Sequence, residues 1–292
     1  MPSTRDIRRR IKSVKNTAQI TKAMQMVAAS KMRRAQQTAL AGRPYAMLMN
    51  QMLAEVTANA GDFHHPLIEK KEKGKHALMV ISTDKGLCGA LNTNLLREAA
   101  KADVDSTIFM TVGRKASQFV ARTKRELSAE FTYKDVPDFA DARAISKYGQ
   151  ELFLQEGIKQ VDVLFTNFIS TLNQHPELRP FLPVGEITGI EAGIEGEKSE
   201  TKLEASPLEF QFEPTAGDVL GNLLPHYLNY QIYQLLLECK ASEHSARMVA
   251  MKSATDNANQ LIKDLTLEYN KLRQASITNE LLEITSASLS VG

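Results

Sequence analysis

The C-terminal quarter of the chain carries an apolar pattern that is too long for one compact domain. From residue 215 to about residue 286 the sequence follows a helical period, which Pro225 is expected to interrupt early. Apolar or small side chains recur there at alternating spacings of four and three. These positions are Leu237, Ala241, His244, Met248, Met251, Thr255, Ala258, Ile262, Leu265, Tyr269 and Leu272. A helix of this length extends over roughly 100 Å, whereas a small domain is roughly 30 Å across. Most of this helix therefore needs a partner helix rather than a globular core.

The N-terminal segment supplies a matching helix from residue 4 to about residue 58. Its apolar positions are Ile7, Ile11, Val14 and Ala18, then Ile20, Met24 and Val27 on a slightly shifted face, then Ala28, Met32 and Ala35. Gly42 and Pro44 predict a kink, because proline removes a backbone donor and glycine weakens a helix. The two helices come from opposite ends of the chain and are joined by the segment between them, so we predict an antiparallel pair.

The middle of the chain changes to a different period. Apolar runs predict buried strands at 76–82, 107–112 and 161–170. Helical stretches are expected at 90–102, 115–123 and 142–157. Further strands, at the edges of the sheet, are expected at 127–133 and 208–212. Alternating strands and helices predict a mostly parallel sheet that is covered on both faces. The predicted fold class is α/β plus long helices: an antiparallel coiled coil of the N- and C-terminal helices with an inserted Rossmann-like α/β domain. We place the coiled-coil shaft at 1–60 and 214–292 and the globular domain at 75–213.

The first helix is strongly basic although the whole chain has a net charge of only +2. Its basic residues are Arg5, Arg8, Arg9, Arg10, Lys12, Lys15, Lys22, Lys31, Arg33 and Arg34, against the single acid Asp6. This distribution predicts contact with an acidic partner. Nucleic acid is the less favoured partner, because no aromatic side chains alternate with these charges to stack on bases. The alternative is that acids of the last helix balance the charge; they are Glu238, Glu243, Asp256, Asp264, Glu268, Glu280 and Glu283.

No group of residues predicts catalysis, a cofactor or a metal site. Residues 84–92 (DKGLCGALN) follow the first strand but fit neither glycine-rich nucleotide motif, so we interpret them as a tight strand-to-helix turn. Cys88 has no histidine near it in sequence. His64 and His65 are adjacent and lack a second ligand pair at zinc spacing. Two cysteines give no disulfide framework and suggest a reducing compartment. We expect no transmembrane span, secretory signal or transit peptide.

Several segments of the chain are similar to one known family. Residues 6–31 (DIRRRIKSVKNTAQITKAMQMVAASK) resemble the start of the gamma subunit of F-type ATP synthase, bacterial type. Residues 84–92 resemble that family's DRGLCGGLN turn, with Lys85 and Ala90 as departures. Residues 242–258 (SEHSARMVAMKSATDNA) and 269–284 (YNKLRQASITNELLEI) resemble its C-terminal helix. The resemblance runs along the whole chain in order, and the middle matches more by pattern than by residue.

The resemblance implies a rotor function. In that family the terminal helices form a central shaft inside a ring of alternating alpha and beta subunits, with the α/β domain near the epsilon subunit and the membrane rotor ring (c-ring). The shaft transmits torque, and the beta subunits perform catalysis. The resemblance implies a single copy per complex, a peripheral location at the cytoplasmic face of a bacterial inner membrane, and no transmembrane segment. No regulatory cysteine pair is present, so redox switching is not expected.

The resemblance also implies contact residues. Those expected to face the alpha/beta ring are Met24, Lys31, Arg247, Arg273, Gln274, Thr278, Leu281 and Ile284. Those expected on the side of the rotor ring and epsilon are Glu209, Phe210 and Phe212. Residues 277–289 would form an apolar tip beyond the reach of the first helix. Two alternative functions remain under consideration. In one, the chain is a basic coiled coil that binds nucleic acid; in the other, it is a small α/β enzyme with helical extensions.

Overall fold

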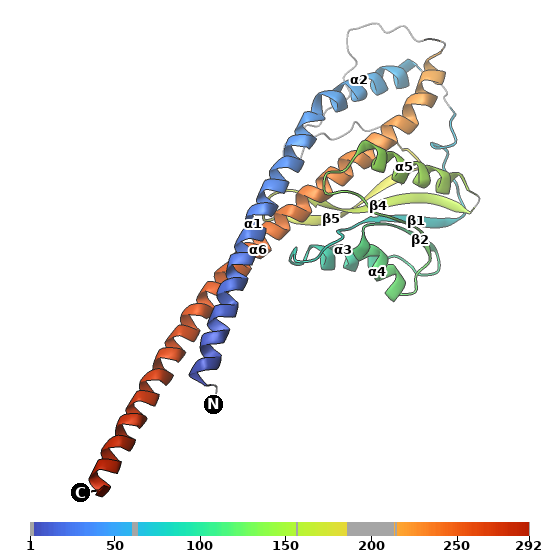
Figure 1. Ribbon diagram of the computed structural model, residues 1–292. Coiled ribbons are helices and arrows are strands. Elements are labelled where there is room, and N and C mark those ends of the chain that lie inside the picture. Colours follow the sequence, from blue (N-terminus) through green and yellow to red (C-terminus); the bar gives the residue numbers. More distant parts are fainter. Residues whose placement is uncertain (1–2, 60–63, 156, 186–212, 214, 292) are drawn as a thin grey trace. The chain divides into compact units, whose positions relative to one another are not determined.

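The computed structural model describes residues 3–59, 64–155, 157–185, 213 and 215–291 (Figure 1). Internal contacts group the chain into two units. One consists of residues 1–28 with 248–292, and the other of residues 29–247. Helices α1 (Thr4–Ala41) and α6 (Ala216–Val291) each run without a break from one unit into the other.

The first unit is an antiparallel helix pair. α1 begins at a capping box, in which Ser3 Oγ donates to the Asp6 carboxylate (2.8 Å) and accepts from the Asp6 backbone N–H (3.2 Å). Further along, the Arg8 guanidinium donates to Tyr269 Oη. The Thr21 and Thr255 hydroxyls are hydrogen-bonded at 2.7 Å. The residue number rises on α1 as it falls on α6, so the predicted antiparallel pairing is confirmed.

The seam of this pair departs from the sequence prediction at one place. The predicted shift of the seam onto Ile20 and Val27 is wrong, because these side chains are 60% and 55% exposed. The seam instead keeps its heptad spacing through Thr21, and the next buried position is Ala28. A polar threonine at a seam position obscured the pattern. On α6 the predicted heptad positions are all buried or half-buried, which confirms that part of the prediction.

The second unit is built on a five-stranded sheet in the order β3-β2-β1-β4-β5. The strands are β1 (Lys75–Ile81), β2 (Thr107–Val112), β3 (Leu127–Phe131), β4 (Ile158–Phe168) and β5 (Gln174–Leu182). The first four are parallel, and β5 pairs antiparallel with β4. The helices around the sheet are α2 (Arg43–Asn59), α3 (Leu91–Ala100), α4 (Arg114–Arg122) and α5 (Phe139–Leu154). The Rossmann-like fold class is therefore confirmed.

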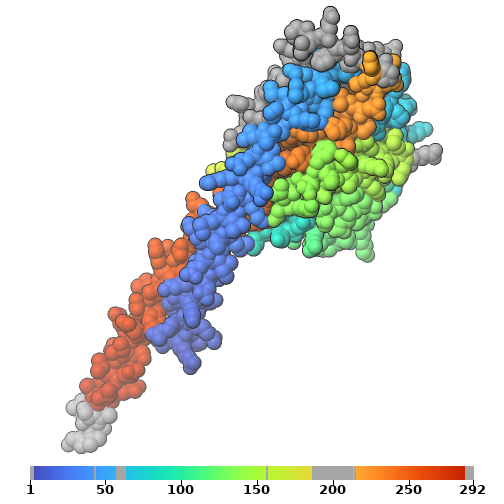
Figure 2. All heavy atoms as spheres, turned by 45° about the horizontal axis from the view of Figure 1, so that its top comes forward, coloured from blue at the N-terminus to red at the C-terminus, as the bar shows by residue number. Residues whose placement is uncertain are grey.

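Helices cover both faces of the sheet (Figure 1). Along β1, Met79 and Ile81 pack into a core shared with α2, α5 and the first part of α6. Leu78 and Val80 pack on the other face against α3 and α4. A strand buried on both faces explains the unbroken apolar run that the sequence shows there. Figure 2 shows α2 (light blue) beside the start of α6 (orange).

Gly42 separates α1 from α2, which confirms the predicted kink. Pro44 has no N–H to continue the helical hydrogen bonds across this point. The Gly42 carbonyl accepts two hydrogen bonds, one from the Ala46 N–H (3.0 Å) and one from the Tyr230 hydroxyl of α6 (2.8 Å). The Tyr230 ring also contacts the Tyr45 ring, with centroids 4.8 Å apart. An aromatic side chain of α6 therefore holds the break in place.

Two details differ from the sequence analysis. Strand β5 was not predicted, because Pro176 and Pro180 argue against a strand; both are tolerated since β5 lies at the sheet edge. Helix α6 continues through Pro225 rather than being interrupted there. The edge strand expected at 208–212 lies outside the described residues. The division into a shaft of 1–60 with 214–292 and a domain of 75–213 stays a prediction. None of the helices described is both long and apolar enough to span a membrane.

Candidate functional site

The carboxyl end of β1 is the place where a doubly wound sheet usually binds ligands, because the strand order reverses between β1 and β4. Here α6 contacts that place directly. The Arg247 guanidinium donates to the backbone carbonyls of Lys85 (3.4 Å) and Gly86 (3.2 Å) in the turn after β1. Ser242 Oγ donates to the Thr166 carbonyl of β4 (3.1 Å). Side chains of the protein's own helix therefore occupy the carboxyl edge of these two strands.

The turn after β1 is held by its own hydrogen bonds. The Asn92 amide donates to Thr83 Oγ1 (2.8 Å) and to Cys88 Sγ (3.2 Å), and the Leu87 backbone adopts a positive φ of 60°. Burial raises the pKa of the Cys88 thiol, with the Arg247 charge opposing this effect. A buried thiol kept protonated is a poor nucleophile. The geometry therefore favours the interpretation of residues 84–92 as a structural turn.

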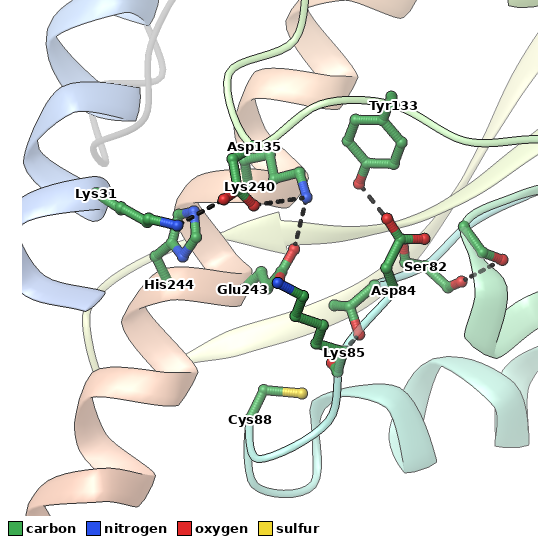
Figure 3. A network of polar contacts seen from close by, with 12 residues as sticks. Lys31, Ser82, Asp84, Lys85, Cys88, Tyr133, Asp135, Lys240, Glu243 and His244 are labelled. Carbon is green, nitrogen blue, oxygen red and sulfur yellow. Dashed lines mark hydrogen bonds and ion pairs between the residues drawn. The ribbon is translucent and has the colours of Figure 1, made fainter. Parts of the chain in front are cut away.

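A cluster of charged side chains lies beside this turn (Figure 3). Lys240 Nζ lies 3.0 Å from a Glu243 carboxylate oxygen and 3.9 Å from Asp135. Arg247 lies 2.9 Å from the second Glu243 oxygen. Asp135, in the loop after β3, also pairs with Lys31 of α1 at 2.5 Å. The cluster thus joins α1, α6 and the sheet domain through three cations and two carboxylates.

The centre of the cluster is withdrawn from water. The side chains of Lys240 and Glu243 are 2% and 4% exposed. Burial raises the pKa of Glu243, but the charges of Lys240 and Arg247 more than offset it, so the pKa lies below its ordinary value. Lys240 Nζ also lies 4.4 Å from the centre of the Tyr133 ring. Removing one side chain of a buried ion pair lowers the free energy of unfolding by about 3–5 kcal/mol, because the other charge is left uncompensated.

His244 is a buried neighbour of these charges. Burial lowers its pKa to about 4, and the charges of Lys240 and Arg247 act in the same direction. Its Nε2 atom has no hydrogen-bond partner among the described residues. The imidazole is therefore neutral near neutral pH.

Most basic residues of α1 have no ion pair with another described residue. Arg9 pairs with Asp6 at 3.9 Å, Arg8 packs over the Tyr269 ring, and Lys31 pairs with Asp135. Among the described residues, no basic side chain of α1 forms an ion pair with an acid of α6. The alternative in which the α6 acids neutralise these charges by direct pairing is therefore not supported, and the charges stay available to a partner.

The predicted contact residues fall into two groups. The structure brings Lys31 and Arg247 together in the charge cluster, where both already have partners within the chain. The second group lies on the helix pair: Met24 is half-buried, and Arg273, Gln274, Thr278, Leu281 and Ile284 are exposed. Glu209, Phe210 and Phe212 lie outside the described residues.

Leu281 and Ile284 form an exposed apolar stretch near the end of α6, at 59% and 66% exposure. Ile277 and Leu282 extend it. Large apolar side chains that are exposed in a group indicate an interaction surface. The apolar tip expected over residues 277–289 stays a prediction, and the side chains of residues 287–289 lie outside those that the structure describes.

Sequence reasoning missed Asp135 and Lys240. The charges of Lys240, Glu243 and Arg247 stand at helical spacings of three and four, which is a signal for mutual pairing that was available. Nothing in the sequence identified Asp135, because a loop residue that meets a helix about a hundred positions later leaves no local pattern.

Known proteins match the chain along its full length. The ATP synthase family matches residues 3–291. The ATP synthase gamma chain of Methylacidiphilum infernorum is 46% identical over 100% of both chains. That of Opitutus terrae is 48% identical over 98% of each.

Solved structures share the fold. A rotor chain of the Euglena gracilis mitochondrial ATP synthase aligns with a TM-score of 0.64 at 19% identity, over 94% of this chain and 98% of that one. A chain of the Tetrahymena thermophila mitochondrial ATP synthase central stalk aligns at 0.59 and 25% identity, over 80% and 99%. With full-length relatives at well over 40% identity, the chain belongs to the ATP synthase gamma chain family.

Proposed function

We propose that the chain is the central rotor shaft of an F-type ATP synthase and transmits torque between a proton-driven membrane rotor ring and catalytic beta subunits. The observation that carries this proposal is the full-length match to ATP synthase gamma chains. The chain is then a non-catalytic subunit of an enzyme complex, and ATP chemistry takes place on the beta subunits.

The described fold supports this function mechanically. α1 and α6 each continue from the sheet unit into the helix pair, so a rotation applied to the sheet domain has a covalent helical path along which to travel. The helix pair presents basic residues that have no ion pair among the described residues, and an exposed apolar stretch at 277–284. These features suit an acidic moving loop and an apolar bearing. The charge cluster ties both helices to the sheet domain.

The proposed partners are the alpha, beta and epsilon subunits and the c-ring, with one copy of this chain per complex. The proposed location is peripheral, at the cytoplasmic face of a bacterial inner membrane. The proposed contacts of the helix pair with the alpha/beta ring are Met24, Arg273, Gln274, Thr278, Leu281 and Ile284. Lys31 and Arg247 are proposed contacts too, in addition to their partners within the chain. Glu209, Phe210 and Phe212 are proposed for the side of the rotor ring and epsilon.

Reconstitution with the cognate alpha and beta subunits tests this function. Native mass spectrometry should give one copy of this chain per hexameric ring, and ATP hydrolysis should require the ring and not this chain alone. If this chain stays unbound, or turns over ATP by itself, the shaft function is wrong.

The exposed pair Arg273 and Gln274 tests the contact assignment. Replacing both by alanine should lower the ATPase rate of the reconstituted complex about tenfold, since one lost charge-assisted contact is worth about 1.5–3 kcal/mol. Lys263→Ala is the matched control, because Lys263 is an exposed cation on the same helix. If the Arg273/Gln274 double variant and Lys263→Ala lower the ATPase rate equally, Arg273 and Gln274 are not specific contacts with the alpha/beta ring.

A further inference from the structure

We propose that Lys240 and Glu243 form a rotational lock that fixes α6 on the sheet domain, and that they are positioning residues for torque transmission. This inference rests on the rotor function proposed above. It concerns the place where turning of the sheet domain must become turning of α6. The contact assignments above concern the helix pair and its partners; the lock lies inside this chain.

Most of the contact between α6 and the sheet domain is apolar. Leu224, Leu228, Leu235 and Leu236 of α6 lie in the core shared with α2, α5 and the sheet. Apolar packing is strong but weakly directional, so a small turn of the helix replaces one apolar contact by another at moderate cost. Such a surface alone tolerates slippage when torque is applied.

The charge cluster differs because its contacts have one geometry. Lys240 reaches Asp135 in the loop after β3, and Glu243 binds Lys240 and Arg247. Arg247 reaches the carbonyls of the turn after β1. Glu243 lies on α6 itself and turns with the helix, so its role is to hold the two cations in position. Successive helix residues point about 100° apart, so a turn of α6 by one position would take Lys240 from Asp135 and Arg247 from the turn carbonyls together.

Burial makes that loss costly. Lys240 and Glu243 are almost fully shielded, and Lys240 Nζ lies over the Tyr133 ring, whose hydroxyl donates to the Ser82 carbonyl at the end of β1 (3.4 Å). A charge that leaves its partner while still shielded from water is left uncompensated, whereas an apolar side chain that slips meets another apolar neighbour. Buried polar groups of this kind select one register of a helix, as a buried asparagine does in a coiled coil.

A double apolar variant separates this function from simple stabilisation. Lys240→Met with Glu243→Met keeps similar volumes, and such replacements of buried ion pairs are often neutral or stabilising. The matched control is Lys147→Met with Glu151→Met, which removes an exposed ion pair (3.7 Å) on α5 of the same unit.

The complete synthase carrying each variant is placed in inverted membrane vesicles, and ATP hydrolysis and ATP-driven proton uptake are measured on one preparation. We expect the ratio of proton uptake to hydrolysis to fall several-fold for the Lys240/Glu243 variant while the synthase still assembles. The midpoint of thermal unfolding is measured alongside, because Arg247 loses its carboxylate partner. The control keeps the wild-type ratio. Lys240→Arg, which retains the charge, should recover most of the ratio.

If the Lys240/Glu243 double variant keeps the wild-type ratio of proton uptake to ATP hydrolysis, the proposed rotational lock is wrong. If the double variant does not assemble, Glu243→Gln against Glu151→Gln is measured in the same way, and an equal ratio for these two again overturns it. Failure of the rotor function itself looks different. In that case the wild-type chain does not assemble with alpha and beta, or its vesicles take up no protons.

Discussion

At the scale of single residues, the most informative group is a histidine that the fold keeps neutral. His244 faces Lys240, Glu243 and Arg247 of its own helix and Asp135 from the neighbouring loop. Its folded pKa of about 4 lies below the ordinary value of 6.5, so the unfolded chain binds the proton more readily. The stability that this creates is complete above pH 6.5 and is lost as the pH falls toward 4.

We therefore predict that the free energy of unfolding falls by about 1–3 kcal/mol between about pH 7.5 and about pH 5, and that His244→Gln removes most of this slope. Urea unfolding of the full chain at both pH values measures it. Burial also lowers the pKa of His65, which leaves a smaller residual slope of the same sign. Exposed His175→Gln serves as the control and should keep the wild-type slope. A His244→Gln slope equal to that of wild type would show that this side chain is not the source.

At the scale of elements, the break between α1 and α2 depends on a close approach that only glycine permits. A Cβ added at Gly42 would lie 2.7 Å from Tyr230 Oη and 3.1 Å from Gln234 Nε2. We predict that Gly42→Ala lowers the free energy of unfolding by about 1–3 kcal/mol through overpacking.

The sign of that effect should depend on one hydroxyl. With Tyr230→Phe as the background, the clash is relieved and the ring contact to Tyr45 is kept. There Gly42→Ala should be neutral or stabilising by up to about 1 kcal/mol, because alanine restricts the unfolded chain. A double-mutant cycle by denaturant unfolding measures this coupling. Additive effects would mean that Gly42 is not constrained by Tyr230.

The elements that sequence reasoning predicted are those whose pattern is local. The heptad seam of α6, the kink at Gly42 and the buried strands follow from spacing and composition within each segment. Sequence reasoning did not predict strand β5, because its prolines argue against a strand unless the strand is known to lie at the sheet edge. The seam position of Thr21 was missed because a polar side chain interrupts the apolar pattern, and only its hydrogen bond to Thr255 identifies it. The exposed contact residues could be named from the resemblance, whereas the Lys240–Asp135 pair required the fold.

At the scale of the whole molecule, the charge is distributed unevenly in a way that the net value of +2 conceals. Arg10, Lys12 and Lys15 are exposed and have no ion pair among the described residues. Charges of this kind contribute little to folding, because they have no partner to lose. They create a positive field that attracts an acidic partner before contact is made.

This asymmetry leads to a prediction about assembly kinetics. Changing Arg10, Lys12 and Lys15 together to glutamine should alter the free energy of unfolding by less than about 0.5 kcal/mol. It should slow association with the alpha and beta subunits about tenfold at low salt, measured by stopped-flow fluorescence. The two rates should converge at high salt, where surface charges are screened. The matched control changes Arg97, Arg122 and Lys124, which are exposed cations of the sheet domain, and should leave the rate near wild type. If both triple variants slow association equally, net charge and not the basic helix attracts the partner.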